Sequence, residues 1–121
     1  MIAVIFEVWP AEGRRDSYLE HAARLRADLE IMDGFISVER FQSITDPNKM
    51  LSLSIWRDEA AVANWRNHGR HRATQAAGRG GVFADYRLRV ASVIRDYGMT
   101  DRRDQAPADS QCAFAAGGEK F

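Results

Sequence analysis

The stretch FISVERFQSITDPNKMLSLSIW, residues 35–56, decides how the rest of the chain is interpreted. Both of its ends alternate in the two-residue period that is typical of β-strands. Between them lies TDPN, residues 45–48, whose residue types favour a tight turn. The stretch therefore predicts an antiparallel hairpin of two strands. Ser52 and Ser54 fall on one face of the second strand, and such small side chains would leave room for a ligand.

Helical and strand patterns alternate on both sides of this hairpin. Before it, Ile2–Trp9 alternates as a strand, and Arg14–Met32 repeats apolar residues at the three- and four-residue spacings of a helix packed on one face. After it, Asp58 is a suitable N-cap for a helix reaching about Ala77, and Tyr86–Arg95 alternates as a last strand. The order β-α-β-β-α-β predicts an α+β, ferredoxin-like fold, with both helices on one face of a four-stranded antiparallel sheet.

The length of the chain and the end of its apolar pattern define the predicted domain organisation. The chain has 121 residues, which fits one domain. We expect a domain over residues 1–97 and a polar, loosely ordered tail over 98–121, because apolar periodicity ends near residue 98. Every predicted strand carries apolar residues on both faces, whereas the helices would cover only one face. We therefore expect a homodimer in which two uncovered sheet faces meet.

Composition and charge exclude several classes of function. Lys and Arg total 17, as do Asp and Glu, which argues against a nucleic-acid partner because such binding needs a basic surface. No apolar run approaches the ~20 residues of a membrane span. The apolar start is interrupted by Glu7 and lacks a basic leader, so we expect no signal peptide and a cytoplasmic location. The single Cys112 rules out an internal disulfide and a Cys-based zinc site.

Three stretches of the chain occur together in one known family. The first is the opening strand followed by Gly13 and a helix, and the second is DGF at 33–35. The third and most specific comprises SIW at 54–56, DEA at 58–60 and WRNHGRHR at 65–72, in which a Trp and a His stand six residues apart. Together they resemble the antibiotic biosynthesis monooxygenase (ABM) family of dimeric α+β barrels. The resemblance covers the predicted domain and agrees with its topology.

This resemblance implies a cofactor-independent monooxygenase that oxidises a small aromatic or similar molecule with O₂ in a pocket between sheet and helices. Two alternatives stay open, namely a haem-binding and haem-degrading enzyme, and a non-catalytic small-ligand-binding or stress-response protein. Haem-degrading members use an Asn on the first strand, a Trp on the second helix and a His about ten residues later. The matching positions here hold Glu7, Trp65 and Gln75, so only the Trp agrees.

Trp65, His71 and Glu7 are the candidate catalytic residues. Trp65 is either a core aromatic or a pocket wall whose indole N–H donates to a ligand. His71 either has a structural role or is the general base that deprotonates a phenol or an acidic C–H group. Glu7 breaks the apolar pattern of its strand, so it faces water, lines the pocket as a rival base, or pairs with Arg87 or Arg89.

Arg72, Gln75 and His68 are the candidate substrate-binding residues. They lie in a segment, residues 60–84, that contains several arginines and no Asp or Glu. A guanidinium at the pocket mouth would hold a substrate carboxylate, whereas the simpler interpretation is a solvated helix face. His68 and His71 stand three residues apart and would be neighbours on a helix, but no third residue with metal-ligand spacing accompanies them. We therefore expect no metal site.

Overall fold

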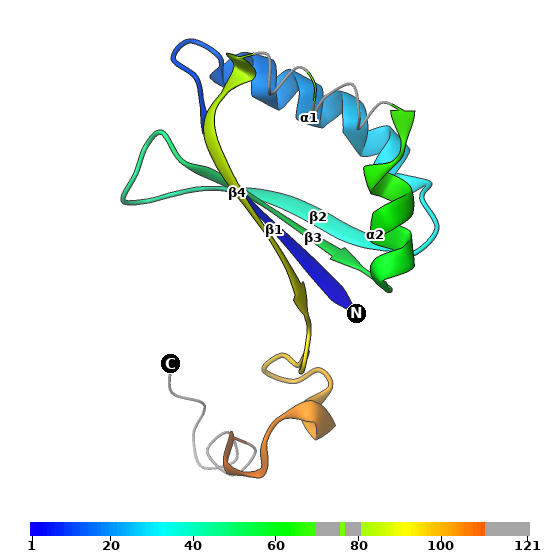
Figure 1. Cartoon of the computed structure of the whole chain (residues 1–121). Helices are drawn as coiled ribbons and strands as arrows, with labels where there is room; N and C mark the ends of the chain where they lie inside the picture. Colours follow the sequence, from blue (N-terminus) through cyan, green and yellow to red (C-terminus); the bar gives the residue numbers. More distant parts are fainter. Residues whose placement is uncertain (70–75, 77–80, 111–121) are drawn as a thin grey trace.

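The computed structural model describes residues 1–69, 76 and 81–110 (Figure 1). Its elements follow the predicted order of strands and helices. They are β1 (Ile2–Pro10), α1 (Arg15–Glu30), β2 (Phe35–Gln42), β3 (Met50–Trp56), α2 (Glu59–Arg66), β4 (Phe83–Ser92) and a short 3-10 helix at Arg103–Gln105.

The four strands form one antiparallel sheet in the order β2-β3-β1-β4, and both helices lie on the same side of it (Figure 1). This arrangement confirms the predicted ferredoxin-like fold. β1 occupies a central position, where Val4 lies opposite Ser54 of β3 and Val90 of β4. Because side chains alternate along a strand, these three residues share the face turned toward the helices.

The end of α2 and both ends of β4 differ clearly from the predicted boundaries, since β4 ends at Ser92 and not at the predicted Arg95. α2 ends at Arg66, well before the predicted end at Ala77, and residues 70–75 and 77–80 lie outside the described part of the chain. Asn67 caps this helix, because both its backbone N–H and its side-chain amide donate to the Ala63 carbonyl. β4 begins earlier than predicted, because Phe83 pairs with Pro10 beyond an irregularity in the β1 register.

The core consists of two apolar clusters that hold the helices against opposite ends of the sheet. The first cluster joins both helices to the end of the sheet where β1 begins and β3 ends. Its buried members are Ile2, Leu25, Leu29, Trp56, Ala61 and Trp65. The second cluster joins the other ends of the same strands to the start of α1; its buried members are Val8, Tyr18, Met50 and Val82. The middle of the layer between sheet and helices belongs to neither cluster.

The segment that follows β4 has local structure. Asp96 N–H donates to the Gln105 side chain, and Ala106 is buried. The expectation of a loosely ordered tail stays a prediction, since residues 98–110 have these local contacts and one short 3-10 helix, and residues 111–121 lie outside the described part of the chain. The division of the chain at residues 97 and 98 stays a prediction.

The connection between α1 and β2 packs tightly against the first turn of α2. Gly34 has a positive φ of 84°, and a Cβ at this position would lie 2.6 Å from the Ala61 Cβ. The Arg57 guanidinium donates to both carboxylate oxygens of Asp33, each at 3.0 Å. Asp58 caps α2 by accepting the Ala61 N–H at 2.9 Å. A residue without a side chain is therefore required where the loop meets α2.

Replacing Gly34 with Ala is expected to destabilise the protein by about 3 kcal/mol, because left-handed backbone strain adds to an overlap with Ala61. Gly13→Ala is the matched control, since Gly13 also has a positive φ, of 73°, but nothing lies within 4 Å of the added Cβ. The control should lose only about 1 kcal/mol. Urea unfolding of both variants measures the difference, and equal losses would show that the contact with Ala61 contributes nothing.

A cavity between sheet and helices

A cavity of about 270 Å³ lies between the sheet and the two helices, in the region that the two apolar clusters leave unfilled. All four strands and both helices contribute to its wall. Ser52, Ser54 and Ala22 take part in the lining, and their small side chains leave the space that larger residues would occupy. The serine pattern of β3 therefore lies where a ligand would need room.

One end of the cavity is mainly apolar, although Arg66 lines it beside Trp65. Its wall there otherwise consists of residues of the first core cluster and their neighbours, namely Val4, Leu25, Leu29, Trp56, Val62 and Trp65. The Trp56 and Trp65 rings lie 6.4 Å apart between centroids. The Trp56 indole N–H donates to the Ser54 hydroxyl at 2.9 Å, so this polar atom is satisfied within the wall.

The middle and the opposite end of the cavity carry the polar groups Tyr18, His21, Arg40 and Ser52. The strand register places Arg40 of β2 directly opposite Ser52 of β3. The Arg40 Nε is buried and has no hydrogen-bond partner among the described residues. Burial raises the pKa of the Tyr18 phenol, and the nearby Arg40 guanidinium partly opposes that rise. Neutral Tyr18 and cationic Arg40 thus lie together at this end.

The β4 side of the cavity is its exposed side. Tyr86, Leu88 and Val90 line the cavity, yet they are 52%, 54% and 49% exposed. Among the described residues of the wall, Arg40 and Arg66 are the arginines, and no Asp or Glu occurs there. The described wall of the cavity therefore combines apolar surface with positive charge.

Of the predicted site residues, Trp65 lies in the cavity wall and is also 8% exposed within the first core cluster, while donation of its indole N–H to a ligand stays a prediction. His68 stacks on Trp65 with ring centroids 5.5 Å apart, and its Nδ1 is buried without a partner among the described residues. His71, Arg72 and Gln75 lie outside the described residues. Their predicted roles in catalysis and substrate binding therefore stay predictions.

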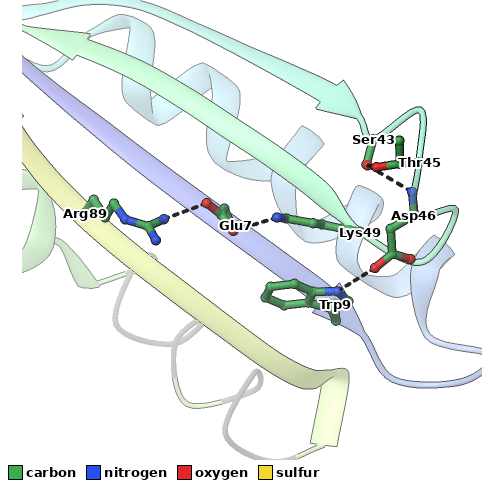
Figure 2. Close-up of polar contacts among 7 residues, drawn as sticks. All are labelled: Glu7, Trp9, Ser43, Thr45, Asp46, Lys49 and Arg89. Atoms are coloured by element: carbon green, nitrogen blue, oxygen red, sulfur yellow. Dashed lines mark hydrogen bonds and ion pairs between the residues drawn. The ribbon is translucent and has the colours of Figure 1, made fainter.

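Glu7 is not among the residues that line this cavity, contrary to the alternative in which it lines the pocket, and its catalytic role stays a prediction. Its neighbours Phe6 and Val8 face the helices, and strand alternation turns Glu7 to the opposite face. There its carboxylate contacts the Lys49 Nζ at 2.8 Å and accepts a hydrogen bond from Arg89 (Figure 2). The hydrogen bond from Lys49 is the main reason that the pKa of Glu7 is lowered. Of the alternatives weighed for Glu7, pairing with Arg89 is confirmed.

The ion pairs of Glu7 extend into a network that ties the β2–β3 turn to β1 (Figure 2). The Lys49 Nζ lies 5.1 Å from the centroid of the Trp9 ring, and the Trp9 indole N–H donates to Asp46 at 3.1 Å. Asp46 in turn accepts the Asn48 N–H within the turn. Glu7 therefore has a structural role on the face that the helices leave uncovered.

Replacing Glu7 with Gln is expected to destabilise the protein near pH 7, and the difference should shrink in acid. The folded-state pKa of Glu7 lies below its ordinary value of 4.5, so its stabilising contribution is present above that pH and is lost as the pH falls through the folded-state pKa. Urea unfolding of both proteins from about pH 7 to pH 3 measures this change. Glu20→Gln, on the exposed face of α1, is the control. A Glu7→Gln difference that is independent of pH would contradict the pairing.

The sequence prediction missed His21 and Arg40 as cavity residues. His21 stands three residues after Tyr18 on the apolar side of α1, a spacing that already indicated a shared face. Arg40 stands two residues after Val38 in an alternating strand, so both belong to the face toward the helices.

In the described part of the chain, no group of three or more His, Cys, Asp or Glu residues is arranged to hold a metal. None of the described helices is long and apolar enough to cross a membrane.

Comparison with known proteins agrees with this architecture. The family model for antibiotic biosynthesis monooxygenase matches residues 1–77. A jasmonate monooxygenase from Pyricularia oryzae is 46% identical over 93 residues, which cover 77% of this chain but 43% of that protein. The chain thus spans less than half of that relative. An uncharacterised protein, YqjZ, from Bacillus subtilis is 31% identical over 93 residues, covering 77% of this chain and 79% of that protein.

Among solved structures, Rv0793 from Mycobacterium tuberculosis superimposes with a TM-score of 0.72 at 14% identity, covering 80% of this chain and 98% of that one. At this identity the likeness shows the fold alone. The match of the family model over more than half of the chain, together with the Bacillus relative, establishes the family. The chain belongs to the antibiotic biosynthesis monooxygenase family.

Proposed function

We propose that the chain is a cofactor-independent monooxygenase that oxidises a small, largely apolar organic molecule in the cavity between sheet and helices. The observation that carries this proposal is the position and character of the cavity, whose largely apolar wall includes Trp56 and Trp65 and also carries a few polar groups. The name of the Pyricularia relative favours a jasmonate-like molecule, a five-membered ring with an apolar side chain, over a strictly aromatic one.

Burial of the ligand's apolar part against this wall supplies binding free energy in proportion to the area removed from water, about 25 cal/mol per Å². The Trp65 side chain fixes one side of the bound molecule. His71 remains the proposed general base, three residues after His68 along the chain. Removal of a proton from a phenol or an acidic C–H group leaves an anion that transfers an electron to O₂ more readily than the neutral molecule does.

The stoichiometry of such a reaction needs no separate reductant. When a phenol becomes a quinone, or a CH₂ group becomes a carbonyl, one oxygen atom of O₂ enters the product and the other leaves as water. The substrate itself supplies the electrons. The task left to the protein is to bind the substrate, to accept its proton and to hold the anion where O₂ reaches it.

Incubation with jasmonic acid under ¹⁸O₂, without added metal or reductant, tests the reaction by mass spectrometry. The expected product contains one ¹⁸O atom. Trp65→Phe and His71→Ala should each slow its formation, because the first alters the cavity wall and the second removes the proposed base. If unlabelled jasmonic acid is recovered, and hemin instead gives a saturable Soret shift, the haem-binding alternative replaces this proposal.

Filling the cavity is expected to weaken binding. Ala22→Leu places a larger side chain in the wall, whereas Ala23→Leu makes the same change at the next residue, on the exposed side of α1. By calorimetry, Ala22→Leu should reduce the affinity for jasmonic acid by at least about tenfold, a loss of about 1.4 kcal/mol. The control should bind like the original protein. Equal affinities in both variants would place the ligand outside this cavity.

We further propose that a second copy of the chain covers the sheet face opposite the helices. Ile5, Leu51, Leu53 and Ile55 form an apolar area there, because they alternate with the residues that face the cavity. At its edge, Glu7 neutralises part of the charge of Lys49 and Arg89, which lowers the cost of removing these groups from water. A self-complementary contact of two such faces gives a closed dimer.

Light scattering coupled to gel filtration tests this assembly. The chain is expected to elute with twice the 13.7 kDa mass of one copy. Leu53→Arg should produce a monomer, because it places an unpaired charge at the centre of the apolar face. Ile44→Arg, at a fully exposed position in the β2–β3 turn, should leave the mass unchanged. A mass of 13.7 kDa for the original chain would contradict the dimer.

A further inference from the structure

We propose that Arg40 binds a carboxylate of the substrate, and that the cavity therefore selects small amphipathic monocarboxylates. This inference rests on the proposed function of the cavity and names the class of molecule that the cavity takes. It concerns a residue that the sequence patterns of the family did not indicate.

The first argument is the unused hydrogen-bonding capacity of Arg40. Its side chain lines the cavity, and its Nε is buried with no acceptor among the described residues. A buried donor on a charged group is costly to leave without a partner. The guanidinium presents its donors in a planar fork that matches a carboxylate in a bidentate manner. Tyr18 already shares a side-chain hydrogen bond with Arg40, so the missing partner among the described residues is the one for the Nε, and a ligand carboxylate would supply it.

The second argument is the charge of the cavity wall. Its described residues include Arg40 and Arg66 but no acidic residue, so no protein carboxylate among them competes for Arg40. The ion pairs of Glu7 with Lys49 and Arg89 lie on the other face of the sheet, outside the cavity. An anion in the cavity would therefore meet positive charge that the described part of the wall does not neutralise.

The third argument is the set of donors beside Arg40. The register places Ser52 directly across from Arg40 on the neighbouring strand, and side chains at such positions have Cβ atoms about 5 Å apart. Tyr18 lies close enough for the Arg40 charge to oppose the rise in the phenol's pKa. Both hydroxyls line the same cavity as the guanidinium. Together these three residues can surround a carboxylate with donors.

The fourth argument is the direction of polarity along the cavity. Val38 precedes Arg40 by two residues on β2 and lies opposite Ser54, one step nearer to Trp56. A carboxylate on Arg40 would leave the remainder of the ligand to extend past Val38 toward the apolar end at Trp65. Binding at Arg40 thus fixes which end of the molecule lies against Trp65. Arg66 also lines the cavity beside Trp65, but Arg66 is exposed whereas the Arg40 Nε is buried, so Arg40 is the guanidinium better placed to hold the carboxylate.

Calorimetric titration with matched acids and esters tests the role of Arg40. The probes are jasmonic acid and its methyl ester, and 4-phenylbutyrate and its methyl ester. The original protein should bind each acid at least about tenfold more tightly than its ester, as expected for a charge-assisted hydrogen bond. Arg40→Gln should reduce this preference to less than about threefold by weakening acid binding, with ester binding little changed. Arg40→Lys should keep part of the preference.

Arg24→Gln is the matched control, because Arg24 lies on the exposed side of α1 and is absent from the cavity wall. It should retain the full preference for the acids, and near-ultraviolet circular dichroism should show that all variants are folded. An equal preference in the original protein and in Arg40→Gln would overturn the proposal, as would failure of both acids to bind. Acid selectivity that depends on Arg40, without ¹⁸O incorporation, would overturn the proposed oxygenation and leave the carboxylate site intact.

Discussion

The alternation of side chains along β1 is the constraint on which the rest of the structure depends. β1 lies between β3 and β4, so each of its residues belongs to a row that crosses three strands of the sheet. The row of Val4 faces the helices and forms cavity wall. The row of Glu7 faces away and holds an ion-pair network. A shift of one residue in this register would turn the cavity-lining side chains to the outer face and the ion-pair network to the face that the helices cover.

The cavity exists because the helices are held at the two ends of the sheet and not along its middle. Tyr18 packs against Val8 at one end, and Leu29 and Trp65 pack near Ile2 at the other. The close approach of Gly34 to Ala61 fixes the start of α2, so its Trp reaches the first cluster. Small side chains on β3 and α1 then leave the centre of the layer unfilled.

The order of elements could be predicted from sequence because each strand and helix carries its own period, and the hairpin at 35–56 needs no long-range information. The end of α2 at Arg66 could not, because the apolar pattern continues past it, and Gly69 and Ala76 are again helical. The cavity could be predicted only in part. Trp65 was identified because aromatic residues on an apolar helix face stand out, and it lines the cavity.

Glu7 and Arg40 show why the remainder of the site was harder to predict. Both are charged residues within strands, and the charge of a side chain does not reveal whether it lies on the sheet face that the helices cover. The alternation of Phe6 and Val8 already assigned Glu7 to the outer face, once the helices were known to cover the other one. Arg40 resembles a solvent-facing residue in the sequence, because burial of its Nε depends on the packing of α1 above β2.

The measurement that tests the central claim most directly is a methyl NMR titration of the isotope-labelled protein with jasmonic acid. The central claim is that the ligand binds on the helix-covered face of the sheet. The predicted result is saturable shifts of the cavity methyl groups of Val4, Val38, Leu25 and Leu29, with those of Leu51 and Leu53 on the opposite face unchanged. Shifts confined to Leu51 and Leu53, or no saturable shift at all, would contradict it.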